Sequence, residues 1–373
     1  MRVLSVVGAR PNFMKVAPII KAFRAYGSAF EQILVHTGQH YDERLSASFF
    51  RDLDLREPDV NLNVGSGSQA EQTAGVLLGF EPVCKNFEPD LVIVVGDVNS
   101  TLACALTAKK LGIKVAHVEA GLRSGDMRMP EEINRRCTDT ISDYLFTTDR
   151  MANGNLASEG IPASKVHFVG NVMIDTLLTF REQAAELRYF DKLGLTPGNY
   201  ATLTLHRPSN VDDLSTLSRI LRTMKCISGS MPIVFPAHPR TRAKIHEFGF
   251  GGAFDGRQFR MIDPLGYLEF LSLNASAKAV FTDSGGLQEE TTILGVPCIT
   301  LRENTERPIT VLEGTNQLVG SDPNAIFAAY NKVQSQAVGT PPAPEKWDGQ
   351  AADRIATQFA EGLPLQQLMR AAS

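Results

Sequence analysis

Short apolar runs rich in β-branched residues recur along this chain, and longer segments with helical periodicity separate them. Strands that alternate with helices form parallel sheets, because each crossover carries a helix over a face of the sheet. In the first half, the expected strands are 2–7, 32–37, 91–95, 114–118, 144–148 and 166–170. In the second half, they are 200–205, 232–236, 259–263, 279–283, 297–301 and 317–320. The pattern therefore predicts an α/β protein with two Rossmann-like domains.

The length of the chain also favours two domains, since 373 residues exceed what one hydrophobic core usually holds together. We expect an N-terminal domain over residues 1–170 and a second domain over 171–350. Gly194, Pro197 and Gly198 interrupt the helical pattern just ahead of the second series of strands. A proline-rich connector precedes a final amphipathic helix at 351–373, which we expect to cross back to the N-terminal domain.

The composition excludes several classes of function. A formal net charge of −4 provides no basic surface for nucleic acid or an anionic membrane. The five cysteines are scattered and form no C-x-x-C pair, so we expect a reducing, cytoplasmic location. No cluster of His, Cys and carboxylate has metal-ligand spacing, and the dinucleotide pattern G-x-G-x-x-G does not follow the first strand. We therefore expect neither a metal nor a bound cofactor.

Polar residues that follow the first strands are candidates for ligand contact, because open parallel sheets bind ligands beyond the carboxyl ends of their strands. Arg10 and Lys15 flank the loop in "GARPNFMKVAP" and could attract an anion. Asp97 follows the strand at 91–95, where it could be either a turn residue or a carboxylate facing a ligand. These positions indicate an anionic ligand near a carboxylate.

The charge-dense segment "VEAGLRSGDMRMPEE" at 118–132 follows the strand at 114–118. Pro130 suits the first turn of a helix, and Glu131 and Glu132 there favour the positive end of the helix dipole. This structural role accounts for one or both helix glutamates, but it does not account for Glu119. Glu119 and Glu131 are therefore candidates for acid/base chemistry.

The second half contains a candidate site for a phosphate group. His206 with Arg207, and His238 with Arg240, directly follow strands, where either histidine could instead be structural. The segment "FTDSGGLQEE" provides the strongest local pattern, because glycine amides at a helix N-terminus bind phosphate well. The residues that could bind a nucleotide are Ser284, Gly285, Gly286 and Glu290 of this segment, and Arg302 and Arg307 of "LRENTERP" further along the chain.

Together these motifs resemble the UDP-N-acetylglucosamine 2-epimerase family. The resemblance extends over nearly the whole chain and includes "GARPNFMKVAP", "TGQHYD", "GDVNST", "HVEAGLRS", "MPEEINR", "TDSGGLQEE" and "NTERP". It implies two domains of the glycosyltransferase-B type that face each other across a cleft, with a UDP-sugar between them. We also expect a homodimer.

Carried over to this sequence, the family pattern implies a set of catalytic residues: Asp97, Glu119, Glu131 and His206. It implies substrate contacts from Arg10, Lys15, Ser284, Gly285, Gly286, Glu290 and Arg307, and a wall around uracil from Leu265 and Phe270. Arg207 and His238 are further expected substrate contacts, because they directly follow strands. Gln39 and His40 match a regulatory second substrate site. The implied reaction interconverts UDP-GlcNAc and UDP-ManNAc by elimination of UDP to a glycal, followed by its re-addition.

Two departures from the family pattern leave the sugar open. The loop between Glu119 and Glu131 is shorter than the common "YSPWPEE" form, and "HRPSN" replaces "HRREN". "DMRMPEEINR" and "HPRTR" also occur in relatives that act on modified UDP-hexosamines such as diacetamido-uronic acids. The alternatives are an epimerase of such a sugar, a hydrolysing epimerase, a sugar transferase on the same scaffold, or a nucleotide-sugar sensor without turnover.

Overall fold

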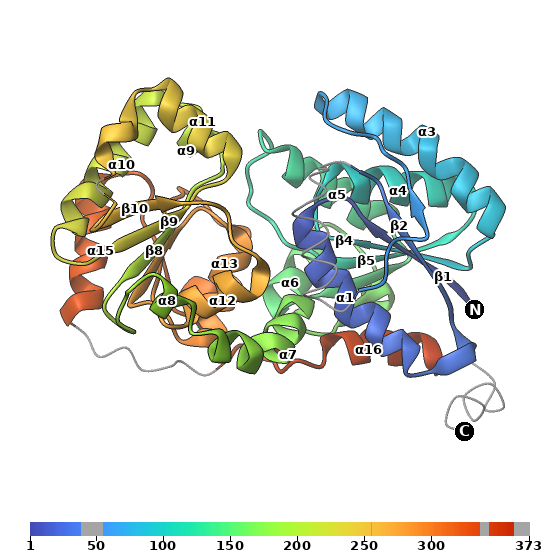
Figure 1. Cartoon of the computed structure of the whole chain (residues 1–373). Coiled ribbons are helices and arrows are strands. Elements are labelled where there is room, and N and C mark those ends of the chain that lie inside the picture. Colours follow the sequence, from blue (N-terminus) through green and yellow to red (C-terminus); the bar gives the residue numbers. More distant parts are fainter. Residues whose placement is uncertain (39–54, 255, 336–342, 362–373) are drawn as a thin grey trace. The chain divides into compact units, whose positions relative to one another are not determined.

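The computed structural model describes residues 1–38, 55–254, 256–335 and 343–361 (Figure 1). The chain divides into two compact units, one formed by Met1–Thr179 with Glu345–Ser373 and the other by Phe180–Pro344. Each unit contains one sheet whose paired strands all run parallel. The prediction of two parallel-sheet α/β units is therefore confirmed.

The sheet of the first unit has the strand order β3-β2-β1-β4-β5-β6-β7. Its strands are β1 (Arg2–Val7), β2 (Glu31–His36), β3 (Val60–Asn61), β4 (Leu91–Val95), β5 (Lys114–Ala120), β6 (Tyr144–Thr147) and β7 (Val166–Phe168). The central strand β4 is buried along its whole length, as expected for a strand covered on both faces. The short edge strand β3 was not predicted, because two residues give no apolar run.

Helices cover both faces of this sheet. They include α1 (Arg10–Arg24), α3 (Gln69–Phe87), α4 (Asn99–Lys110), α5 (Pro130–Ile141), α6 (Arg150–Ser158), the first half of α7 (Val172–Leu187), which continues into the second unit, and α16 (Ala351–Ala360). The last of these, α16, lies beside α1 in the first unit (Figure 1). Phe359 of α16 packs against Phe23, Tyr144 and Phe146, so the end of the described chain shares the core of the N-terminal unit.

The sheet of the second unit has the order β10-β9-β8-β11-β12-β13. Its strands are β8 (Ala201–Thr204), β9 (Ile233–Pro236), β10 (Phe259–Ile262), β11 (Ala279–Thr282), β12 (Cys298–Thr300) and β13 (Asn316–Leu318). The longer helices are α10 (Leu214–Ser228), α11 (Pro239–Glu247), α12 (Tyr267–Ala275), α13 (Gly285–Leu294) and α15 (Pro323–Ser335), and the short ones are α8 (Tyr189–Lys192), α9 (Pro208–Val211) and α14 (Ile309–Leu312).

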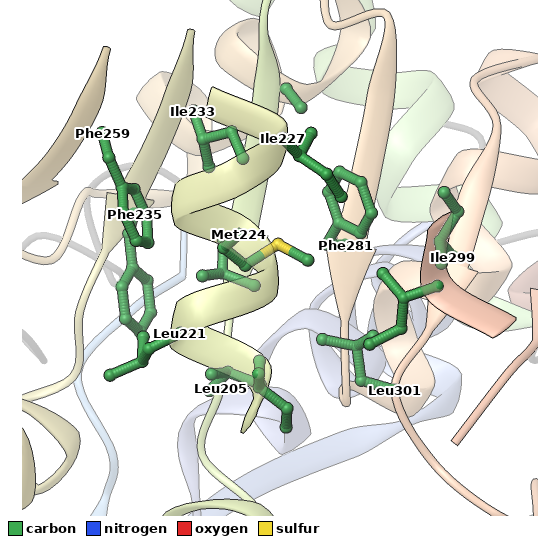
Figure 2. Close-up of a cluster of buried hydrophobic side chains, with 14 of the residues drawn as sticks. Leu205, Leu221, Met224, Ile227, Ile233, Phe235, Phe259, Phe281, Ile299 and Leu301 are labelled. Atoms are coloured by element: carbon green, nitrogen blue, oxygen red, sulfur yellow. The ribbon is translucent and has the colours of Figure 1, made fainter. Parts of the chain in front are cut away.

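Apolar side chains from the strands and from α10 form the core of the second unit (Figure 2). Phe235 of β9 and Phe281 of β11 project toward Leu221 and Met224 of α10, and all four side chains are buried. The apolar residues of α10 recur every three or four positions, so one face of the helix contacts the sheet. This packing holds the strand ends in register and thereby fixes the loops that follow them.

Candidate active site

Each sheet reverses its strand order at one point, which is where open parallel sheets bind ligands. In the first unit this point lies between β1 and β4, and in the second between β8 and β11. The loops that follow these four strands contain the polar segments predicted from the sequence, at residues 8–10, 96–98, 205–207 and 283–284. The topology therefore gathers the candidate residues of each unit at one edge of its sheet.

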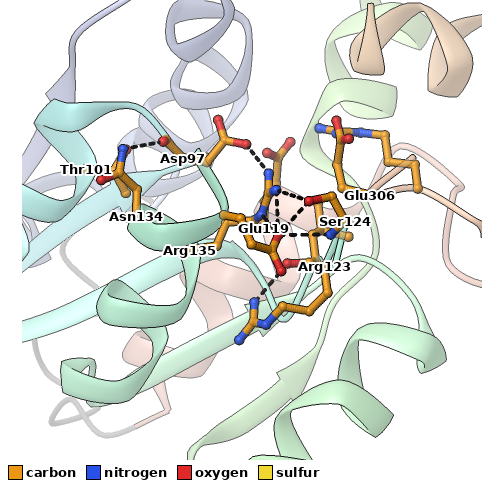
Figure 3. A network of polar contacts seen from close by, with 12 residues as sticks. Asp97, Thr101, Glu119, Arg123, Ser124, Asn134, Arg135 and Glu306 are labelled. Carbon is orange, nitrogen blue, oxygen red and sulfur yellow. Dashed lines mark hydrogen bonds and ion pairs between the residues drawn. The ribbon is translucent and has the colours of Figure 1, made fainter. Parts of the chain in front are cut away.

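Asp97 lies in the loop between β4 and α4, where Gly96 takes a left-handed conformation with φ of 68°. The carboxylate of Asp97 accepts a hydrogen bond from Arg135 Nη1 at 2.5 Å, and its backbone oxygen accepts one from Asn134 at 2.9 Å (Figure 3). The Asp97 side chain keeps 25% of its surface exposed, whereas that of Arg135 keeps 2%. A buried arginine thus fixes a carboxylate that remains accessible.

Glu119 lies at a β-bulge, since the register of β5 against β6 shifts between Val118 and Ala120. Its φ of 71° belongs to the left-handed region, which is unfavourable for a glutamate by about 1–2 kcal/mol. A bulge turns a side chain away from the alternating pattern of the strand, and bulges occur often beside active sites. The strain therefore suits a residue whose direction matters for function.

The Glu119 carboxylate forms a buried ion pair with Lys15 of α1. A Cβ atom on Gly96 would lie 2.9 Å from Lys15 Nζ and 3.6 Å from Glu119 Oε2, so a larger residue here would displace the end of the lysine from this pair. Lys15 was predicted to contact substrate, which stays a prediction, and the structure pairs it with Glu119. The ion pair brings Glu119 next to the loop that holds Asp97.

The two glutamates at the start of α5 occupy different environments. Glu131 is half-buried, whereas Glu132 is fully buried and accepts hydrogen bonds from Ser124 and Gly125 as well as Arg135. Burial by itself would raise the pKa of Glu132, but the Ser124 N–H and Arg135 outweigh this effect and lower the pKa to about 2. Glu132 therefore anchors the charge-dense loop, which leaves Glu131 as the candidate for acid/base chemistry.

In the second unit, His206 follows β8 and its Nδ1 lies 2.8 Å from Asp283 Oδ1. The fully buried Asp283 also accepts hydrogen bonds from the backbone of Arg207 and from Asn210. Burial by itself would raise the pKa of Asp283, but the facing His206 and the backbone N–H groups lower it below its usual value. The sequence marked Asp283 only as the end of a strand, whereas the structure shows that it orients His206, whose side chain is 47% exposed.

The segment Ser284–Gly286 forms the start of α13, with Ser284 as the N-cap residue. A Cβ atom on Gly285 would lie 2.5 Å from Glu306 Oε1 and 2.6 Å from Arg307 Nη1, so glycine allows a guanidinium to pack against the helix N-terminus. Unsatisfied N–H groups, the helix dipole and a nearby arginine all attract an anion. This end of α13 can therefore bind a phosphate group.

The two arginines of "LRENTERP" are buried within an ion cluster. Arg307 contacts Glu289 at 2.6 Å and Glu306 at 2.5 Å, and Arg302 contacts Glu306 at 2.7 Å. Burial alone would raise the pKa of Glu306, but Arg307 and Arg302 hold it well below its usual value. The sequence pointed to Arg302 and Arg307 as counter-charges for a diphosphate but did not identify Glu306, which aligns both.

Glu290 is fully buried in α13, and burial together with neighbouring Glu289 raises its pKa to about 8. A protonated carboxyl group there can donate as well as accept a hydrogen bond. Leu265 and Phe270 pack around the cluster that includes Tyr200 and Leu287. His238 is the N-cap residue of α11 and accepts a hydrogen bond from the Arg240 backbone at 3.3 Å.

The roles predicted for Arg10, Gln39 and His40 stay predictions. Arg10 is the first residue of α1, and Gln39 and His40 lie outside the described residues. Within the described ranges, no three His, Cys, Asp or Glu side chains gather as they would around a metal ion. The described helices likewise include none that is long and apolar enough to cross a bilayer.

The topology of the two units, with a helix start that can bind phosphate, is that of doubly wound α/β proteins, a class in which nucleotide binding is common. The family model described as UDP-N-acetylglucosamine 2-epimerase matches residues 23–360. Because this match covers most of the chain, the protein belongs to the UDP-N-acetylglucosamine 2-epimerase family, which confirms the resemblance found in the sequence. It is therefore a member of a family of isomerases.

Similar proteins agree with this assignment. A UDP-N-acetylglucosamine 2-epimerase of Methanococcus maripaludis is 44% identical over 88% of this chain and 90% of its own. A UDP-2,3-diacetamido-2,3-dideoxy-D-glucuronate 2-epimerase of Pseudomonas aeruginosa is 39% identical over 97% of this chain and 100% of its own. The crystal structure of the Methanocaldococcus jannaschii UDP-GlcNAc 2-epimerase in complex with UDP-GlcNAc and UDP covers 97% of this chain and 100% of its own, with a TM-score of 0.90 and 40% identity.

Proposed function

We propose that this protein interconverts UDP-N-acetylglucosamine and UDP-N-acetylmannosamine by elimination and re-addition of UDP. The observation that carries the proposal is the bulge at Glu119, which accepts an unfavourable backbone conformation and directs a buried carboxylate beside the Asp97 loop. Two carboxylates from adjacent strand ends suit proton transfer at one carbon atom. The family and the relatives that act on UDP-GlcNAc support the same substrate.

The reaction must invert C2, whose hydrogen has no neighbouring carbonyl group to acidify it. In the proposed route, a base removes the C2 proton, its bonding electrons form a C1–C2 double bond, and the C1–O bond breaks to release UDP. Return of a proton to the other face of C2 and re-addition of UDP at C1 then give the 2-epimer. Asp97, Glu119 and Glu131 are the proposed acid/base residues, because this route needs groups on both faces of the sugar.

The second unit is proposed to hold the nucleotide and to stabilise the charge that develops on the departing diphosphate. Ser284, Gly285 and Gly286 would bind phosphate at the start of α13. His206 and Arg207 lie beside them, because β8 pairs with β11 and their backbone N–H groups donate to Asp283. The other proposed substrate contacts are Arg10, Lys15, His238, Leu265, Phe270, Glu290 and Arg307.

The mixed ion cluster around Arg307 gives the arginine a definite role. Glu306 and Glu289 hold its guanidinium against Gly285, so the arginine is oriented before any anion arrives. Such an arrangement avoids the entropy cost of ordering a long side chain when the ligand binds. Arg307 therefore complements the helix dipole rather than acting as an exposed counter-charge.

A second candidate substrate is a UDP-2,3-diacetamido-uronic acid. It is favoured by the Pseudomonas aeruginosa relative, which aligns with 97% of this chain at 39% identity. We further propose a cytoplasmic homodimer, whose stoichiometry native mass spectrometry would establish. These finer assignments concern the sugar, the assembly and the location and leave the elimination chemistry unchanged.

Proton and phosphorus NMR of the purified protein with UDP-GlcNAc tests the proposal. We expect UDP-ManNAc to accumulate to equilibrium without any acceptor, which a sugar transferase would require. Release of free N-acetylmannosamine with UDP would instead identify a hydrolysing epimerase. If UDP-GlcNAc does not change but the UDP-diacetamido-uronic acid turns over, the latter is the substrate. If the protein binds either nucleotide sugar without turnover, the enzyme proposal is overturned.

A further inference from the structure

A buried histidine that the proposed reaction does not use lies two residues before Glu119. His117 belongs to β5 and is fully buried. Its Nδ1 lies 2.6 Å from Asp139 Oδ1 of α5, and its Nε2 lies 2.8 Å from the backbone oxygen of Gly96. Both ring nitrogens therefore have oxygen partners in the interior of the unit.

These partners determine which ring nitrogens carry protons. A carbonyl oxygen can only accept, so Nε2 must donate to Gly96. Asp139 also accepts from Arg123 at 2.8 Å and from the Gly121 N–H at 3.0 Å. Arg123 and the Gly121 N–H both donate to the Asp139 carboxylate without involving His117, so we expect it to be ionised and to accept from Nδ1 as well.

The His117–Asp139 pair closes a ring of alternating acidic and basic side chains. Successive nitrogen–oxygen distances in this ring lie between 2.5 and 3.4 Å. In order, its members are Asp97, Arg135, Glu132, Arg136, Glu159, Arg123, Asp139 and His117. The ring begins at the side chain of Asp97. It returns through His117 to the backbone oxygen of Gly96, the residue before Asp97.

The position of Gly96 explains what this ring controls. The Gly96 N–H donates to Val118 at 3.0 Å while its carbonyl oxygen accepts from His117, so β5 holds both polar groups of this glycine. Two sets of charged groups face His117. Asp139 lies on one side with Arg123 behind it, and the Lys15–Glu119 pair lies on the other side, beyond Gly96. The ring contains four carboxylates, and its basic members besides His117 are three arginines.

We infer that His117 is a positioning residue, a buried imidazolium that fixes the Gly96–Asp97 peptide and thereby the Asp97 carboxylate relative to Glu119. The kinetic part of this inference rests on the proposed epimerase reaction. The protonation state of His117 does not, because it follows from contacts within the first unit.

The first test is nitrogen-15 NMR of histidine-labelled protein without substrate, with the His117 signals assigned by their loss in His117→Gln. The chain has seven histidines, so the assignment by difference is practical. We expect both His117 nitrogens to be protonated at neutral pH. A neutral His117 imidazole, with one unprotonated nitrogen, would overturn the inference whether or not the protein turns over UDP-GlcNAc.

The second test compares variants in steady-state kinetics. A misplaced catalytic group costs on the order of 10²-fold in rate, so His117→Phe should lower kcat by about this factor with little change in KM. His117→Gln keeps one donor and should recover part of the loss. His167→Gln changes another histidine of the same sheet, in β7, and should keep wild-type kinetics.

Asp139→Asn covers the case in which the His117 variants do not fold. It keeps the shape of the side chain but removes the charge that holds the second proton on His117, so it should lower kcat and change its pH profile. Wild-type kcat and pH profile in folded Asp139→Asn would contradict the inference. If wild-type protein shows no turnover of any UDP-hexosamine, the proposed function fails, and the NMR result still decides the state of His117.

Discussion

Glu132 provides a quantitative test of the buried charges behind the site. Its pKa falls from the ordinary value of 4.5 to about 2, which corresponds to about 3 kcal/mol of stability at neutral pH. Because the pKa is lowered on folding, this stability is present above about pH 4.5 and is lost as the pH falls toward 2. Glu132→Gln should therefore destabilise the first unit by about 3 kcal/mol at pH 7 and by about 1 kcal/mol less at pH 4.

The single tryptophan makes the assay specific to this unit. Trp347 is buried in the first unit and donates from Nε1 to the Thr148 backbone oxygen at 3.0 Å, so its fluorescence reports unfolding there. The control is Glu31→Gln, which removes a carboxylate from an exposed pair with Arg2 and should cost less than about 1 kcal/mol. Urea unfolding in which Glu132→Gln matches this control, or in which its cost is the same at pH 7 and pH 4, would refute the reasoning.

Three further changes have expected outcomes. Gly96→Ala should lower stability by about 1–2 kcal/mol, because the backbone φ at this position is left-handed, and it should also lower turnover by displacing Lys15. The control is Gly112→Ala, where φ is 76° and the space around the residue is open, so only the stability loss is expected. Because the pKa of Glu290 is raised to about 8, folding takes up a proton at pH 7. In thermal unfolding, Glu290→Gln should therefore stabilise the protein by as much as about 3 kcal/mol at pH 7 but not at pH 4. The same variant should bind UDP more weakly. Phe281→Ala should cost about 3–5 kcal/mol in chemical unfolding followed by circular dichroism, since the ring is fully buried in the second core, and a cost below 1 kcal/mol would contradict the packing.

The sequence predicted the strands well because continuous apolar runs have few alternatives in a helix-covered parallel sheet. It also placed Asp97, Glu119, His206 and Ser284 near strand ends, and the structure shows them there. This success follows from topology, since all strands of a parallel sheet end on the same edge. The two-residue strand β3 could not be found, because its pairing with β2 depends on tertiary contacts.

The contacts between side chains could not be predicted in the same way. Adjacent helical residues point about 100° apart, so no pattern showed that Glu132 rather than Glu131 is buried. The His117–Asp139 contact joins residues 22 positions apart, and the Lys15–Glu119 contact joins residues 104 positions apart. Such contacts depend on how β5 packs against α1 and α5, which residue spacing alone does not encode.

Incorporation of solvent deuterium at C2 of the UDP-sugar tests the central claim most directly. With wild-type protein in deuterated water, the account predicts one deuterium at C2 in both epimers recovered from UDP-GlcNAc, measured by proton NMR and mass spectrometry. Glu119→Gln should abolish the exchange, whereas the exposed control Glu31→Gln should leave it unchanged. Epimers that form without deuterium at C2, or a folded Glu119→Gln variant that exchanges at the wild-type rate, would contradict the account.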